Sequence, residues 1–241
     1  MSSNDHLTDP TKAEHDPTQS DRPLRSIKSF VVRRRRFNDH QWQTFQTLKS
    51  RYGLDNDRAL AIETAFGNRH PLIIEIGFGM GDSLIEDADR HPNTNYLGIE
   101  VHEPGIALAL KKIAQLKLAN LLLVQTDAKY YLEHHVADQT VSRLQIYFPD
   151  PWPKKRHQKR RLLNQAFLEL AQTKLKKNGF IHFATDMVDY AQAVQKLCQR
   201  LDFPIKRVTT DRPKTKYEQR GEKLGHQIFD YYIYRQDNGV C

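Results

Sequence analysis

The chain has 241 residues, with 37 Lys and Arg against 29 Asp and Glu, so its formal net charge is +8. Hydrophobic residues make up 39% and aromatic residues 10%, which is enough for a sizeable core and excludes a fibrous or mostly disordered chain. No apolar run approaches the roughly 18 residues of a membrane span, and the first residues lack the apolar segment of a secretory signal. The two cysteines, Cys198 and Cys241, give neither a disulfide framework nor a metal-ligand spacing. We therefore expect a cytoplasmic protein without a metal site.

The excess positive charge is concentrated in three segments. Residues 26–36 carry five basic and no acidic groups, and residues 154–161 carry six basic and no acidic groups. Residues 206–223 carry seven basic and three acidic groups, and the rest of the chain is net acidic. Solvated loops also carry such runs. Three basic patches on an acidic body nevertheless favour a polyanionic partner, namely a nucleic acid.

The chain is predicted to have three parts. Residues 1–24 are polar and net acidic and contain three prolines, which predicts a disordered tail. Residues 25–70 are predicted to form a basic extension with one or two short helices. Residues 71–236 alternate β-branched runs with helical stretches. This pattern predicts an α/β, Rossmann-like domain with a mostly parallel sheet of about seven strands and helices on both faces.

The regular part of the sequence indicates the individual elements. The predicted strands run from Leu72 to Gly77, Tyr96 to Glu100, Leu121 to Gln125, Leu144 to Phe148 and Phe180 to Ala184. The predicted helices cover residues 81–90, 103–118, 163–177 and 187–201. Two last apolar runs, 205–209 and 228–235, have no predicted helix between them and are expected to pair antiparallel at one edge. The long, basic connection 210–225 is predicted to be a functional loop.

A glycine-rich turn follows the first predicted strand. Gly77, Gly79 and Gly81 let a ligand approach the backbone, which is typical of a nucleotide-like cofactor site. Glu100 ends the second strand and Asp127 follows the third, so both acids are expected at the same edge of the sheet. These acids suit a cofactor that carries adenosine and positive charge but no phosphates, as S-adenosylmethionine does. A simple turn and an NAD site are the alternatives, and the G-x-G-x-G spacing counts against NAD.

The loop after the fourth strand combines a carboxylate, an indole and a basic run. Three prolines stiffen the segment around Asp150 and Trp152. A fixed carboxylate beside an indole can accept the N–H groups of a guanine edge while the ring stacks. The basic residues 154–161 would then hold phosphates. As an alternative, Trp152 covers the core and the loop is only a turn.

Five segments together resemble one known family. They are EIGFGMG (75–81), GIEVH (98–102), FPDPWPKKRHQKRR (148–161), ATD (184–186) and TKYEQRGEKLGH (215–226). Over residues 24–235 the chain is similar to the bacterial tRNA (guanine-N7)-methyltransferases, which are class I S-adenosylmethionine-dependent enzymes. The resemblance implies methylation of N7 of a guanine in tRNA, in the variable loop at position 46, to give 7-methylguanosine.

The same resemblance implies roles for individual residues. The implied S-adenosylmethionine contacts are Glu75, Glu100, Asp127 and Asp150, with Asp150 also the catalytic residue. The implied substrate contacts are Lys154, Asp186, Thr215, Lys216, Tyr217 and Glu218, and the implied RNA contacts are Arg156, His157, Gln158, Lys159, Arg160 and Arg161. Tyr217 stands where many members carry Phe, which retains the aromatic face. No obligate protein partner is implied, and the chain is expected to be a monomer or a homodimer.

The chemistry of guanine N7 sets what such an enzyme must supply. N7 has a free lone pair, so alignment of the reactants is needed rather than a strong base. We expect Asp150 to hold the base by its N1 and N2 hydrogens and to stabilise the positive charge that develops on it. Asp186 is expected to be a second acceptor. An adenine-N6 DNA methyltransferase and a non-enzymatic RNA-binding protein are the remaining alternatives.

Overall fold

The computed structural model of the chain describes residues 39–236. The tail predicted for residues 1–24 and the basic segment 26–36 lie outside these residues. The first strand begins at Leu72, close to the predicted domain boundary at residue 71, and the division into three parts stays a prediction. In the described part of the chain, every helix is too short or too polar to cross a bilayer.

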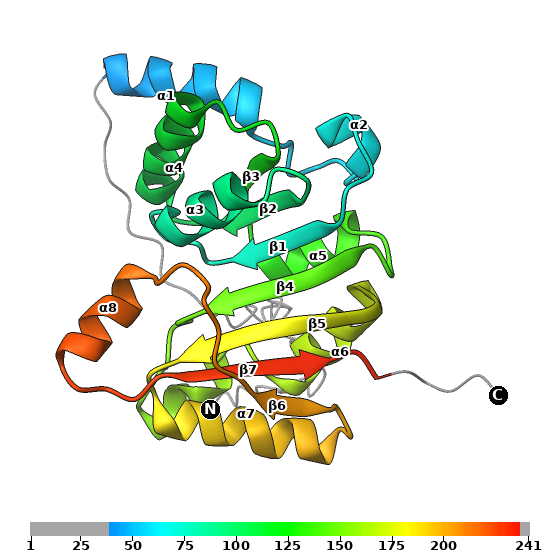
Figure 1. Cartoon of the computed structure of the whole chain (residues 1–241), viewed down its shortest axis with the longest axis vertical. Coiled ribbons are helices and arrows are strands. Elements are labelled where there is room, and N and C mark those ends of the chain that lie inside the picture. The colour runs from blue at the N-terminus through cyan, green and yellow to red at the C-terminus, as the bar shows by residue number, and fades with distance from the viewer. Residues whose placement is uncertain (1–38, 237–241) are drawn as a thin grey trace, which may run out of the picture.

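A seven-stranded sheet forms the centre of the fold, in the order β3-β2-β1-β4-β5-β7-β6 (Figure 1). The strands are β1 (Leu72–Ile76), β2 (Asn95–Glu100), β3 (Leu121–Gln125), β4 (Val141–Tyr147), β5 (Leu175–Thr185), β6 (Ile205–Arg207) and β7 (Phe229–Tyr234). The neighbours among β1 to β5 pair in parallel, and β7 is antiparallel to both β5 and β6. The predicted sheet with its antiparallel edge pair is confirmed.

Helices cover both faces of this sheet. They are α1 (Asp39–Tyr52), α2 (Ile62–Phe66), α3 (Asp82–Arg90), α4 (Glu103–Leu116), α5 (Ala128–His135), α6 (Gln165–Lys174), α7 (Val188–Arg200) and α8 (Lys216–Lys223), with a 3-10 helix at Lys155–Arg160. One hydrophobic cluster joins the sheet to α5, α6 and α7, and a second joins it to α1, α3 and α4. In β1, Leu72, Ile74 and Ile76 belong to the first cluster and Ile73 to the second. Because β1 is buried on both faces, its apolar residues do not alternate with exposed polar ones, and Glu75 is the one charged residue in it.

On the α1, α3 and α4 side, the half of the sheet formed by β4, β5 and β7 carries polar side chains. In β4, Gln145 alternates with the buried apolar residues Leu144 and Ile146. His182 in β5 is paired in register with Gln145, and both are about 1% exposed. We call the residues on this side, Arg143, Gln145, Tyr147, His182 and Asp230, the polar layer. It runs along β4 and β5 toward the carboxyl ends of the strands, where Tyr147 ends β4 and where ligands bind in such folds.

One helix was predicted too long, and two helices were not predicted. The helix predicted for 163–177 ends at Lys174, and Lys177 and Gly179 lie inside β5. The helix α5 was not predicted, and α8 lies within the segment 210–225 that was predicted to be a loop. Both helices begin at a capping side chain. Asp127 accepts a hydrogen bond from the Tyr130 amide at 3.0 Å, and Thr215 accepts one from the Glu218 amide at 3.1 Å.

Candidate active site

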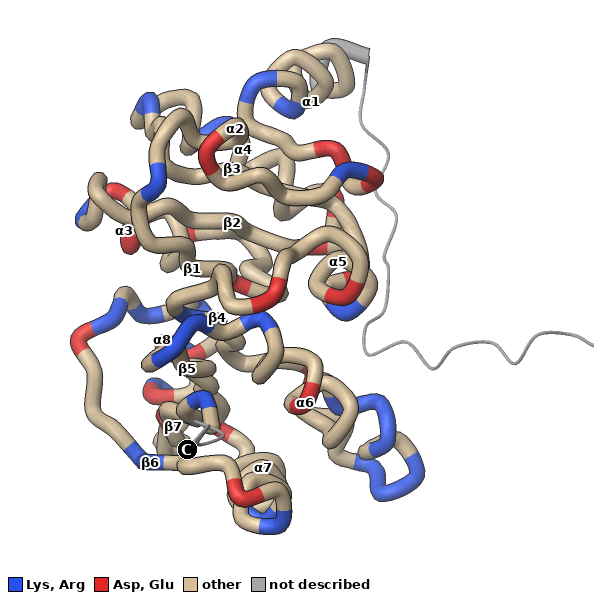
Figure 2. Tube along the Cα trace, turned by 90° about the vertical axis from the view of Figure 1, so that its right-hand side faces the viewer, with Lys and Arg blue, Asp and Glu red and all other residues tan. Residues whose placement is uncertain are grey.

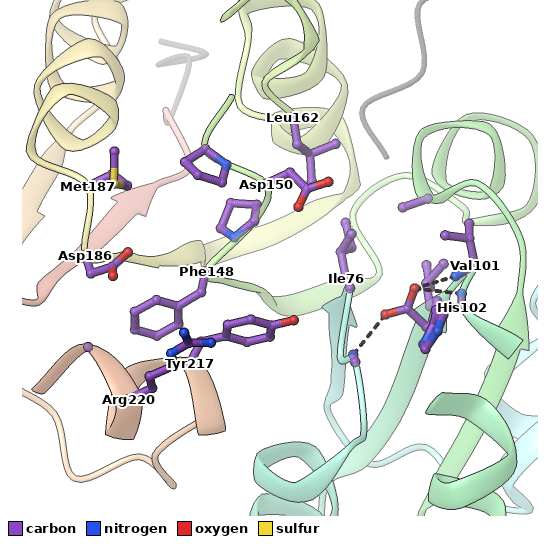
Figure 3. A pocket seen from close by; sticks show the side chains of 18 of the residues that line it. Ile76, Val101, His102, Phe148, Asp150, Leu162, Asp186, Met187, Tyr217 and Arg220 are labelled. Atoms are coloured by element: carbon purple, nitrogen blue, oxygen red, sulfur yellow. Dashed lines mark hydrogen bonds between the residues drawn. The ribbon is translucent and has the colours of Figure 1, made fainter. Parts of the chain in front are cut away.

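A pocket of about 590 Å³ opens at the carboxyl ends of β1 to β5 and is closed on one side by α8. Of the predicted site residues, it is lined by Gly77, Gly79, Glu100, Asp127, Asp150, Asp186 and Tyr217. Figure 3 shows Asp186, Phe148, Tyr217 and Arg220 on one side of this pocket and Ile76, Val101 and His102 on the other. The structure therefore brings these seven of the predicted cofactor and substrate residues to one cavity.

Glu100 fixes the glycine-rich turn. Its Oε2 accepts a hydrogen bond from the Gly79 amide at 2.9 Å, and its Oε1 accepts from the amides of Val101 at 2.7 Å and His102 at 2.9 Å (Figure 3). Gly79 has φ 59°, a left-handed conformation that favours glycine. Gly81 has φ 76° but does not line the pocket, and a Cβ there would lie 2.9 Å from the Ala109 Cβ. Gly81 thus serves the packing of the turn on α4.

Glu75 lies behind the turn rather than in the pocket. Its side chain faces the polar layer and is 2% exposed. Burial, together with the nearby Asp87 carboxylate, raises the pKa of Glu75 to about 8. Glu75 is consequently a neutral carboxylic acid at pH 7, and the predicted direct contact of Glu75 with a cofactor is not provided by the pocket lining.

The buried carboxyl of Glu75 makes the stability of the fold depend on pH. Because its pKa is raised in the folded state from an ordinary value near 4.5 to about 8, its contribution to stability is complete below pH 4.5 and is lost as the pH rises to 8. We expect Glu75→Gln to unfold with a free energy similar to wild type at pH 5 and higher by on the order of a few kcal/mol at pH 8. Urea unfolding at both pH values measures this difference. A parallel pH dependence of the two proteins would contradict it.

Asp150 and Asp186 are placed in the pocket by the loops that follow β4 and β5. Phe148 and Trp152, which flank Asp150, have φ values of 50° and 43°, strained conformations that cluster at functional sites. Partial burial raises the pKa of the Asp150 carboxyl, and the Arg160 guanidinium opposes this shift. Asp186 Oδ2 lies 3.0 Å from Nδ1 of His226, just beyond α8. Both carboxylates line the pocket, and one oxygen of Asp186 is already engaged by His226.

The helix α8 lies along one side of the pocket (Figure 3). Tyr217, Arg220, Gly221 and Leu224 line the pocket. The side chain of Lys216 pairs at 2.8 Å with Asp82, the first residue of α3 after the glycine-rich turn. The predicted substrate residues Lys154, Thr215, Lys216 and Glu218 do not line the pocket, since Thr215 caps α8 and Glu218 is buried against Arg212.

The 3-10 helix carries the basic run beside Trp152. The Arg160 guanidinium lies 3.9 Å above the Trp152 ring, and His157 contacts the same ring edge-on. Figure 2 shows a projecting loop beside α6 that carries several Lys and Arg residues. Lys154, Lys155, Arg156 and Lys159 are exposed. The side-chain amide of Gln158 donates to Asp189 in α7 at 3.4 Å.

The expectation that Arg161 contacts RNA is not supported by its position. Arg161 is 6% exposed, and its Nε donates to the Pro151 carbonyl at 2.8 Å. Its guanidinium also pairs with Asp189 and lies 4.6 Å from the Tyr190 ring. Arg161 therefore fastens the Asp150 loop to α7, and the exposed cations before it face the solvent.

Comparison with known proteins decides the family. A family model described as "Putative methyltransferase" matches residues 69–231. A tRNA (guanine-N(7)-)-methyltransferase of Actinobacillus pleuropneumoniae serotype 5b (strain L20) is 39% identical over 229 residues, covering 91% of this chain and 92% of that protein. One of Francisella tularensis subsp. novicida (strain U112), with the same name, is 42% identical over 216 residues, covering 86% and 94%. The chain belongs to the tRNA (guanine-N7)-methyltransferase family.

A solved structure of a different methyltransferase shares the fold of this tRNA (guanine-N7)-methyltransferase family member. It is a SAM-dependent O-methyltransferase from Thermotoga maritima, with a TM-score of 0.51 and 17% sequence identity. The similarity covers 75% of this chain and 65% of that one. At this identity the likeness concerns the fold alone, and it agrees with the predicted Rossmann-like architecture.

Several residues that line the pocket of this methyltransferase were not predicted from the sequence. Arg220 and Leu224 line the pocket together with Tyr217. The spacing i, i+3 and i+7 places all three on one helical face, and the Thr-x-x-Glu sequence at 215–218 is a capping box that marks the helix start. Arg212, which pairs with Glu218, could not be predicted from the local sequence because its other partner, Asp230, lies in β7.

Proposed function

We propose that this protein transfers the methyl group of S-adenosylmethionine to N7 of a guanine in tRNA and forms 7-methylguanosine. The observation that carries the proposal is a pocket with carboxylates on both sides. Glu100, Asp127, Asp150 and Asp186 all line it, and Figure 3 shows Asp186 and Tyr217 across the pocket from Val101 and His102, whose amides Glu100 binds. The relatives that share about 40% of the sequence carry the name of this activity.

The Glu100 side of the pocket fits S-adenosylmethionine. The Glu100 oxygens keep lone pairs beyond those used by the three amides, and these can accept hydrogen bonds from ribose hydroxyls. Gly77 and Gly79 let the ligand approach the turn closely. Carboxylates favour a cationic sulfonium and disfavour a pyrophosphate. When bound, the cofactor supplies an electrophilic methyl group.

The opposite side fits a guanine whose N7 must be aligned rather than deprotonated. Asp150 and Asp186 accept the N1 and N2 hydrogens of the base, and this contact strengthens as the ring becomes positive. The Phe148 and Tyr217 rings border the same region (Figure 3) and supply an aromatic surface for the base. Alignment of the reacting atoms contributes several kcal/mol to catalysis, with estimates of about 7 to 11 kcal/mol at best.

The basic 3-10 helix supports an RNA partner that lies next to this pocket. Lys154, Lys155, Arg156 and Lys159 are exposed on the loop that begins at Asp150, so phosphates bound there lie beside the base site. We place the modified guanine in the variable loop at position 46 and the protein in the cytoplasm, where unmodified tRNA is available.

A methyl-transfer assay tests the proposed function. Unmodified tRNA is incubated with the protein and S-adenosylmethionine labelled in its methyl group, and the RNA is digested to nucleosides. We expect label in 7-methylguanosine, and the matched tRNA in which guanine 46 is replaced by adenine should remain unlabelled. Label in adenine of DNA, or binding of tRNA without any transfer, would overturn the proposal in favour of an adenine-N6 methyltransferase or a non-enzymatic RNA-binding protein.

A further inference from the structure

The guanidinium of Arg212 contacts two carboxylates, Asp230 in β7 and Glu218 in α8. Its Nε and Nη2 donate to the two oxygens of Asp230 in β7 at 3.0 and 3.1 Å, and its Nη1 donates to Glu218 Oε2 in α8 at 2.6 Å. The side chains of Arg212 and Glu218 are only 7% and 8% exposed. The guanidinium also lies 4.5 Å from the Tyr147 ring. One side chain thus joins the sheet to the helix that carries Tyr217.

Residues of the polar layer support the contact between Arg212 and Asp230. His182 Nε2 lies 2.8 Å from Asp230, and His182 Nδ1 lies 2.9 Å from the Tyr147 hydroxyl. Although burial opposes it, the hydrogen bonds from His182 and Arg212 lower the pKa of Asp230. Asp230 therefore stays charged opposite Arg212. Removing one partner of such a buried pair leaves an uncompensated charge and is strongly unfavourable.

The other attachments of α8 are more exposed and hold it less firmly. The side chains of Lys216 and Asp82 are 66% and 31% exposed, and those of His226 and Asp186 are 45% and 26% exposed. Solvent-exposed ion pairs of this kind contribute little. The position of α8, and with it the position of the Tyr217 ring, consequently depends mainly on Arg212.

We infer that Arg212 is a positioning residue for the guanine-binding half of the pocket, and that Glu218 acts through Arg212 rather than on the base. This inference rests on the proposed function. Glu218 lies on the buried side of α8, whereas Tyr217, Arg220 and Leu224 line the pocket. Its carboxylate is engaged by the guanidinium, so its role is to set the orientation of the helix.

A double-variant cycle tests the inference. Arg212→Lys keeps the positive charge but loses the planar guanidinium that contacts two carboxylates at once. Glu218→Gln keeps the size of the Glu218 side chain but removes its negative charge. We expect kcat with tRNA to fall about 100-fold in Arg212→Lys, as misplacement of a reacting group does, while the affinity for S-adenosylmethionine stays within about 3-fold. The double variant should be no slower than Arg212→Lys alone. If the two losses multiply, Glu218 contacts the base independently and the inference is wrong.

Hydrogen exchange of α8 supplies a second measurement that does not require activity. The amides of residues 216–223 should lose protection in Arg212→Lys and in Asp230→Asn, but not in Tyr217→Ala, which removes a pocket side chain only. The exposed pair between Lys214, which precedes α8, and Glu222 within α8 is the matched control, and Lys214→Gln should leave both exchange and kcat unchanged. Unchanged protection in Arg212→Lys would overturn the inference. A failure of the proposed function would instead appear as wild-type protein that does not label tRNA.

Discussion

Asp150→Asn is expected to lower the rate of methyl transfer by at least about 100-fold, because loss of one preorganised charged contact at developing charge typically has that effect. The amide keeps the size of the side chain but loses the negative charge that faces the guanine ring. Asp150→Ala should be equally slow, since both variants lack the carboxylate. Single-turnover rates with tRNA measure the chemical step, and calorimetry measures S-adenosylmethionine affinity separately.

The affinity measurement separates two roles for Asp150. If Asp150 acts on the base, cofactor affinity stays within a few-fold of wild type in both variants. Asp89→Asn is the control, since Asp89 is an exposed carboxylate on α3 that does not line the pocket. Turnover that survives in both Asp150 variants would remove this residue from the catalytic role.

Replacing Lys155, Arg156 and Lys159 together by Ala is expected to weaken tRNA binding and to flatten its dependence on salt. Each lost phosphate contact reduces the slope of log K against log salt by roughly 0.7 to 0.9, so three contacts reduce it by about 2 to 3. The expected loss of affinity is on the order of 100-fold at low salt, where counterion release is most favourable. Filter binding at several salt concentrations gives both values.

A second triple variant controls for the change in net charge. Lys111, Lys177 and Lys196 are exposed and lie on α4, β5 and α7, away from the Asp150 loop. Their replacement by Ala removes the same charge, and the salt slope should remain that of the wild type. Equal slopes in the two triple variants would show that net charge, rather than the 3-10 helix, governs tRNA binding.

The sequence indicated the cofactor half of the site well and the substrate half poorly. Glu100 and Asp127 end or follow parallel strands, and parallel register brings such positions to one edge whatever the side chains do. The pairing of the parallel strands therefore determines where Glu100 and Asp127 lie. Glu75 lies on the same face of the sheet as Glu100, but it is paired in register with Gly98, two residues before Glu100. It therefore stays below the edge of the sheet, where the side chain is buried.

The substrate half depends on contacts between residues far apart in sequence. Arg161 and Glu218 are charged residues in polar segments, and nothing local distinguishes them from exposed neighbours. Their burial follows from Asp189 in one case and from Arg212 and Asp230 in the other. The capping box at Thr215 was the one local signal for α8, and α5 had a similar signal in Asp127.

The contact between Lys216 and Asp82 joins two binding equilibria. Lys216 belongs to the helix that borders the base, and Asp82 follows directly on the turn that borders the cofactor. A shift of α8 therefore changes the contact that Lys216 makes beside the glycine-rich turn. Thermodynamic reciprocity then requires that the factor by which bound cofactor changes tRNA affinity equals the factor by which bound tRNA changes cofactor affinity. Because the Lys216 side chain is largely exposed and the Asp82 side chain is partly exposed, we expect this shared factor to be small.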